Sequence, residues 1–94
     1  MKIDAVIWLT YVVDKLASKH RVETTEVEEM LNNHPKIRLV EKGTRRGEDV
    51  YLALGQTYAG RYLAVLFIYK KTSEALILSA RDMAAKERRL YGKK

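Results

Sequence analysis

The sequence contains no cysteine, which excludes disulfides, zinc–thiolate sites and thiol nucleophiles and is typical of a reducing compartment. It also has no apolar run near the roughly 20 residues that a membrane-spanning helix needs, since the longest covers only residues 62–69. At the N-terminus, Asp4 precedes a short apolar stretch, whereas a signal peptide has a basic start and a longer apolar region. We therefore expect a cytoplasmic protein.

Internal repeats, low-complexity tracts and linkers are missing as well. With 94 residues the chain can build one modest core and has no room for a second. The hydrophobic share of 47% is that of a globular chain and argues against disorder. We expect a single domain spanning residues 1–94.

Acidic residues are fewer than basic ones, and the formal net charge is +6. The acids concentrate in residues 23–29, whereas bases cluster in residues 36–46 and 86–94. This segregation predicts a positive face suited to a polyanion, most simply a nucleic acid, or to an acidic protein that covers it. Alternatively, some of the C-terminal lysines lie on a solvent-exposed helix and tail and bind no ligand.

Apolar spacing predicts the first half of the chain to be a strand and two helices. Residues 3–8 are rich in β-branched side chains and predict a strand, and residues 10–19 repeat apolar positions at helical spacing. A single helix from Asp4 onward is the alternative. Thr25 with Glu28 resembles a capping box that opens a short second helix, which Pro35 ends.

From residue 36 onward the period changes to two, and turn residues separate four apolar segments. The expected strands cover residues 36–39, 50–54, 62–69 and 75–80, and the third is apolar on both faces, as in a central strand. Asp82 is a suitable N-cap for a last helix over residues 83–91. The order β-α-α-β-β-β-β-α predicts an α+β fold, with an antiparallel sheet and helices packed on one face.

Three groups of residues, taken in order, resemble the BrnT family of toxins over residues 8–91. The first is Lys19-His20-Arg21-Val22 with Glu26, Glu28 and Glu29. The second is Gly47-Glu48, then Gly55, Thr57, Gly60, Arg61 and Leu63, and the third is Ser79-Ala80-Arg81, Glu87, Arg88 and Tyr91. The chain departs from the family at Arg21, where the family has glycine, and after Glu48, where Asp49-Val50-Tyr51 supplies no arginine.

This resemblance implies a RelE/ParE-like fold and a ribonuclease toxin of a bacterial type II toxin–antitoxin system. The implied enzyme cuts RNA without a metal or other cofactor. Its implied partners are RNA and a BrnA-like antitoxin with a ribbon-helix-helix DNA-binding domain, in a 2:2 complex. Two alternatives are a non-catalytic binding module on the same scaffold and a poison of a target other than RNA.

Cleavage of RNA without metal requires a proton acceptor, a proton donor and fixed cations beside the reacting phosphate. Arg61 and Arg81 are the candidate cations, because strand ends in a meander can lie side by side and guanidinium binds phosphate through two N–H groups. The alternative is that they brace a helix or pair with a carboxylate such as Glu87. His20 is the candidate acid or base, and it could equally cap a helix. Glu48 is a candidate base, or it balances the arginines beside it.

The remaining candidates are expected to hold RNA through its phosphates or bases. The candidate phosphate contacts are Lys19, Arg45, Arg46, Lys86 and Arg88. Among the aromatic residues, Tyr58 and Tyr91 are expected to be exposed, and Trp8 is expected to lie in the core. We expect the antitoxin to cover the first helix, with Tyr11, and the sheet rim near Arg61.

Overall fold

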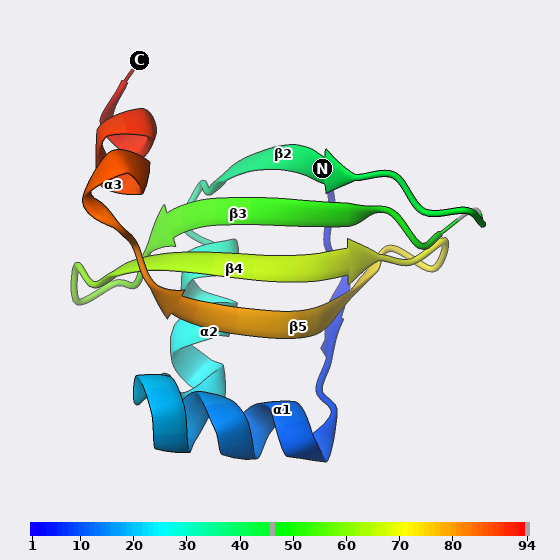
Figure 1. The fold of residues 1–94 in the computed structure, drawn as a ribbon, viewed down its shortest axis with the longest axis horizontal. Coiled ribbons are helices and arrows are strands. Elements are labelled where there is room, and N and C mark those ends of the chain that lie inside the picture. The colour runs from blue at the N-terminus through cyan, green and yellow to red at the C-terminus, as the bar shows by residue number, and fades with distance from the viewer. Residues whose placement is uncertain (46, 94) are drawn as a thin grey trace.

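A mixed α+β arrangement is seen in the computed structural model, which describes residues 1–45 and 47–93 (Figure 1). Over these residues the sheet has five strands in the order β1-β5-β4-β3-β2. The strands are β1 (Ala5–Ile7), β2 (Lys36–Glu41), β3 (Val50–Gln56), β4 (Tyr62–Tyr69) and β5 (Glu74–Asp82). The helical segments are α1 (Thr10–Lys15), the π-helical turn η1 (Leu16–His20), α2 (Thr24–Leu31) and α3 (Ala85–Gly92). The predicted α+β class is confirmed.

The sheet is antiparallel from β2 to β5, but not at β1. Each of β2–β3, β3–β4 and β4–β5 is an antiparallel pair, because the connections between these strands are too short for the crossover that parallel pairing needs. In contrast, β1 pairs with β5 in parallel, with Ala5 opposite Glu74. The expectation of an entirely antiparallel sheet is therefore wrong for β1, which no tight turn connects to its neighbour. The central position expected for residues 62–69 is confirmed, since β4 lies third of the five.

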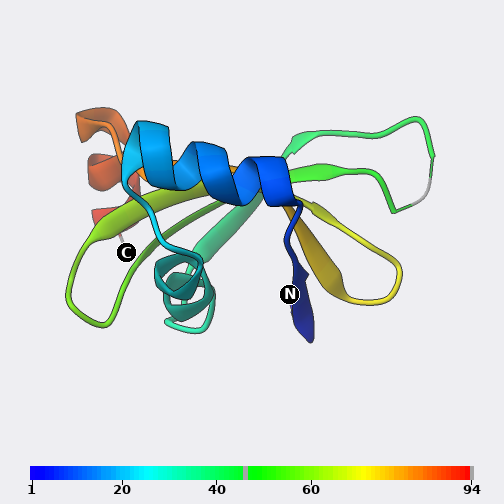
Figure 2. The ribbon, with the colours of Figure 1, turned by 90° about the horizontal axis from the view of Figure 1, so that it is seen from below.

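Helices cover both faces of the sheet, which corrects the expectation that they pack on one. The main core joins α1, η1 and α2 to one face, with Leu16, Met30, Leu63 and Phe67 among its fully buried residues. A smaller cluster lies on the other face, where Tyr91 of α3 packs against buried residues of β3 and β4. Figure 2 shows α3 and α2 on opposite sides of the sheet. The reason is that the alternation of side chains along β3 places the apolar residues Leu52 and Leu54 on the second face.

Both predicted caps are displaced from where the sequence suggested them. Helix α2 is capped at Glu23, not Thr25, and Glu26 Oε1 accepts the Glu23 backbone N–H at 3.0 Å. Glu28, the expected capping-box acid, instead accepts a hydrogen bond at 2.9 Å from the indole N–H of Trp8, which packs against the core.

At the other end of the chain, β5 continues through Asp82, so this residue lies in a strand and does not cap the last helix. The helix follows Ala84, whose N–H donates to Glu87 at 2.8 Å. Glu87, rather than Asp82, therefore supplies the capping carboxylate of α3.

The first helical segment begins at Thr10, as predicted, and runs on to His20 through a π-helical turn. Residues Ala5–Ile7 form a strand, which excludes a single helix from Asp4.

In the part of the chain that the structure describes, no helix is long and apolar enough to cross a membrane.

Candidate functional site

The start of β4 and the end of β5 lie side by side, as the sequence suggested. Ala64 lies opposite Arg81 and Leu63 lies opposite Asp82. Because side chains alternate along a strand, Arg81 points to the α3 face of the sheet and Asp82 to the α2 face. Arg61, two residues before Leu63, bonds to Asp82 on the α2 face. The two candidate arginines thus share one end of the sheet but lie on opposite faces of it.

Arg61 is held entirely by protein groups. Its Nε and Nη2 donate to the two carboxylate oxygens of Asp82 at 2.8 and 3.3 Å, and its Nη1 donates to Glu26 at 3.0 Å. Further bonds from Nη1 and Nη2 reach the backbone oxygens of Arg21 at 2.8 Å and His20 at 3.1 Å. A guanidinium has five N–H donors, and all five have an acceptor here.

These contacts tie the end of η1 and the start of α2 to the end of the sheet through one side chain. The hydrogen bonds from Arg61 hold the pKa of the Asp82 carboxyl below its ordinary value, and the charge of His20 contributes to the same shift. His20 is half-buried and lies at the end of η1. This geometry favours the bracing role of Arg61 that the sequence left open, and its catalytic role stays a prediction.

Arg81 is arranged differently, with part of its guanidinium turned to solvent. Its Nη1 and Nη2 donate to the two oxygens of Glu87 at 2.6 and 2.9 Å, and its side chain is 46% exposed. This is the carboxylate pairing that the sequence raised as an alternative. These hydrogen bonds lower the pKa of Glu87, and the nearby charge of Arg38 adds to the effect. Within the described residues, Nε and one N–H of Nη2 have no acceptor, so Arg81 can still bind an oxyanion.

More cations and two aromatic rings gather on the same face of the sheet as Arg81. Lys36 and Arg38 lie opposite Leu54 and Leu52, which places them on the α3 face. The Arg88 guanidinium carbon lies 4.2 Å from the ring centroid of Tyr62, and the rings of Tyr62 and Tyr91 meet edge to face at 6.1 Å. We call this group the α3-face cluster: Lys36, Arg38, Arg81, Arg88, Tyr62 and Tyr91.

Helix α3 depends on this cluster for its position, because none of its own residues is buried. The Lys36 ammonium donates to the backbone oxygens of Leu90 and Lys93 at the end of the helix. It also lies 5.9 Å from the ring centroid of Tyr91. Lys36, together with Arg81 through its bond to Glu87, therefore holds α3 in place.

The other predicted site residues are dispersed. Glu48 and Arg45 are exposed in the β2–β3 loop, at the far end of β3 and about 20 Å from Arg61 at the usual rise of a strand. Lys19 is exposed on η1 and Lys86 on α3. Arg46 lies outside the described residues. The structure thus puts Arg88 on the same face as Arg81, through its contact with Tyr62, but does not bring Glu48 or Arg45 to either candidate arginine.

Sequence reasoning missed Lys36, Arg38 and Tyr62 as members of the cluster. The signal was present, because alternation in residues 36–39 puts Lys36 and Arg38 on one face of their strand. It could not be used without knowing that α3 returns to that face and brings Arg88 to Tyr62.

Arg21 adopts a backbone conformation that glycine favours, with φ of +52° at the end of η1. Its N–H and that of Val22 both donate to the Leu16 oxygen and close the helical segment. A left-handed conformation costs a non-glycine residue roughly 1–2 kcal/mol. We therefore expect Arg21→Gly to raise the free energy of unfolding by up to about 1 kcal/mol, measured by urea denaturation. Arg21→Val, with a branched side chain, should lower it, and equal stabilities would contradict the prediction.

Comparison with known families decides the identity of the chain. Residues 13–87 match the family model described as the ribonuclease toxin BrnT of type II toxin–antitoxin systems. The chain belongs to this family. The matched range contains all of the α3-face cluster except Arg88 and Tyr91. No curated protein sequence matches the chain.

As a BrnT toxin the chain has RNA as its substrate class and an antitoxin protein as its partner. Both are consistent with the excess of positive charge. Over residues 1–45 and 47–93, no three His, Asp or Glu side chains lie together in a way that could hold a metal ion.

Proposed function

We propose that this BrnT protein is a metal-independent RNA endonuclease that arrests growth and binds RNA over the α3-face cluster. We further propose a RelE/ParE-like fold in a single domain of residues 1–94. The proposed partner is a BrnA-like antitoxin with a ribbon-helix-helix domain, in a 2:2 complex in the cytoplasm. The observation that carries the RNA site is the exposed Arg81 guanidinium, oriented by Glu87 and lying on the same face of the sheet as Arg38 and Arg88.

The chemistry needs positive charge where negative charge develops. When a 2′-hydroxyl attacks its own phosphodiester, the phosphorus centre gains negative charge, which preorganised cations stabilise without reorganisation. Arg81 keeps donors free for two phosphate oxygens, and Arg38 lies on the same face. These guanidiniums supply the charge that a bound metal ion supplies in other nucleases.

Aromatic rings on the same face suit single-stranded RNA. Stacking of bases on aromatic rings and guanidinium planes is the common mode by which proteins hold unpaired nucleotides. Tyr62 already carries the Arg88 guanidinium over its ring, and Tyr91 is half-buried beside it. A base can bind by joining this stack or by displacing Arg88 from it.

His20 is the proposed proton carrier, and it lies near Asp82 at the same end of the sheet as Arg81 but on the α2 face. A phosphate bound to Arg81 would therefore have to reach His20 around the end of the sheet. Glu48 is the weaker candidate, since the length of β3 separates it from that end. Its exposed position in the loop instead fits the alternative that it balances the neighbouring arginine.

The purified protein should cleave single-stranded RNA in the presence of EDTA, because its own side chains supply the positive charge. The measurement is the fragment pattern of a labelled oligonucleotide with EDTA and with added magnesium. Fragments should end in a 2′,3′-cyclic phosphate, the product of attack by the 2′-hydroxyl. Cleavage that appears only with magnesium would overturn the mechanism, and RNA binding without cleavage under either condition would favour a binding module.

A further inference from the structure

One edge of the sheet is open to an additional strand. Among the described residues β2 pairs with β3 alone, so its outer backbone groups face away from the sheet (Figure 1). Leu39 and Val40 are 51% and 52% exposed, which is high for large apolar side chains in a sheet. An edge with unpaired backbone groups and apolar side chains is a template for pairing with another chain.

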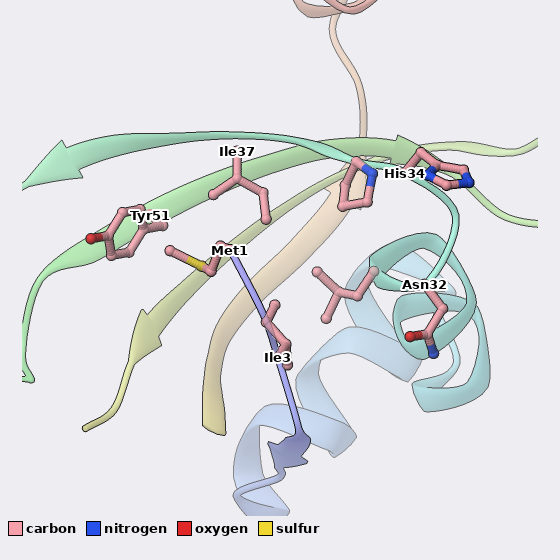
Figure 3. Close-up of a pocket in the computed structure, with 8 residues that line it drawn as sticks. Met1, Ile3, Asn32, His34, Ile37 and Tyr51 are labelled. Carbon is pink, nitrogen blue, oxygen red and sulfur yellow. The ribbon is translucent and has the colours of Figure 1, made fainter. Parts of the chain in front are cut away.

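A groove lies beneath this edge on the α2 side. It has a volume of about 510 Å³, and its walls include Ile37 and Tyr51 from the sheet, Leu31 from α2 and Ile3 from the N-terminal segment. Figure 3 shows Ile37 and Tyr51 facing Met1 and Ile3 across it. Leu39 lies opposite Tyr51, so it shares the face of the sheet that lines the groove. A strand added to β2 would therefore direct every second side chain toward an apolar surface.

The two faces of β2 differ in charge. Ile37 and Leu39 lie on the groove face, whereas Lys36 and Arg38 lie on the α3 face. Residues directly opposite in neighbouring strands share a face. A partner strand with apolar side chains on the groove face would therefore place them beside Ile37 and Leu39. On the other face, acidic side chains would be attracted to Lys36 and Arg38. The edge therefore fits an extended segment in which acidic and apolar residues alternate.

A second copy of this chain fits the edge poorly. A symmetric antiparallel pair of β2 strands keeps each side chain on its own face, so Lys36 and Arg38 would lie opposite their counterparts. Like charges directly opposite one another are destabilising. The register of β2 also shifts between Leu39 and Glu41, which limits the regular edge to Lys36–Leu39.

We propose that the β2 edge is a docking site for an extended antitoxin segment that alternates acidic and apolar residues. This rests on the proposed function for the identity of the partner. Binding there adds backbone hydrogen bonds to β2 and fills the groove with apolar side chains. It also places carboxylates beside Lys36 and Arg38, two cations of the α3-face cluster, and so lowers the positive charge available to RNA.

A synthetic peptide tests this surface without requiring the antitoxin or RNA cleavage. The probe is an acetylated eight-residue peptide of alternating Asp and Val, and the control peptide alternates Lys and Val. Amide hydrogen exchange followed by NMR should slow at least tenfold in Lys36–Leu39 at saturating Asp–Val peptide. Fluorescence anisotropy with labelled peptides should show at least tenfold weaker binding of the Lys–Val control.

Matched variants separate this surface from the first helix. Leu39→Glu should weaken binding of the Asp–Val peptide at least tenfold and leave RNA cleavage unchanged. Tyr11→Glu, at a side chain 69% exposed on α1, should leave peptide binding within twofold of the wild type. A wild-type protein that binds the peptide but cuts no RNA would contradict the proposed function and leave this docking site supported.

Four results would overturn the proposal. The first two are no peptide binding at millimolar concentration and equal binding of both peptides. The third is exchange that slows in α1 or α3 in place of β2. The fourth is protection of β2 from exchange that increases with protein concentration in the absence of peptide. The last would identify a second copy as the occupant.

Discussion

Arg81→Ala should reduce the rate of RNA cleavage about 100-fold while the fold stays intact. Removing one preorganised charge-stabilising group typically costs 10²–10³ in rate, and a factor of 100 corresponds to about 2.7 kcal/mol. Because the Arg81 side chain is 46% exposed, its pair with Glu87 adds about 1 kcal/mol or less to stability. The measurement is single-turnover cleavage of a labelled oligonucleotide, with the thermal midpoint of each protein determined in parallel.

Two further variants make this result specific. Arg81→Lys keeps the charge but cannot form the two-pronged contact with phosphate, so we expect about a tenfold loss. Arg89→Ala removes the same charge from an exposed position on α3 outside the cluster and should change the rate less than threefold. If Arg81→Ala cleaves RNA as fast as the wild type, Arg81 serves only to hold α3 through Glu87.

Local pattern was sufficient to predict most strands of this fold. The apolar run of residues 62–69 and the tight turns around it predict a central strand in an antiparallel meander, and β4 has that position. The parallel pairing of β1 with β5 could not be predicted, because it joins segments about 70 residues apart. The placement of α3 on the second face depends on Tyr91 packing beside Tyr62, which sequence spacing does not encode.

The candidate site was harder to predict, because tertiary partners decide how a charged side chain is used. Asp82 and Glu28 both fit cap patterns, yet Arg61 engages the first and Trp8 the second. Arg61 and Arg81 looked equivalent at two strand ends, and only the register shows that they lie on opposite faces. Sequence alone could name both arginines but could not tell a saturated guanidinium from one with donors still free.

Arg61→Ala should have its main effect on stability, lowering the free energy of unfolding by about 2–4 kcal/mol. The variant loses hydrogen bonds from a charged donor and leaves Glu26, 26% exposed, and the backbone oxygens of His20 and Arg21 without their partner. Urea denaturation at pH 7 measures the loss, with Arg89→Ala expected within about 0.5 kcal/mol of the wild type. Arg61→Lys should recover only part of the loss, because an ammonium has three donors for these acceptors.

The pH dependence of the difference in stability between wild type and Arg61→Ala tests whether the Arg61–Asp82 pair contributes to that difference. Folding lowers the pKa of Asp82 below its ordinary value of 3.8, so the pair stabilises the fold fully above that value. Its contribution is lost as the pH falls through the lowered value, where the carboxyl becomes protonated. The gap in stability between wild type and Arg61→Ala should therefore narrow as the pH falls below 3.8. An Arg61→Ala protein as stable as the wild type but inactive on RNA would instead make Arg61 a phosphate contact.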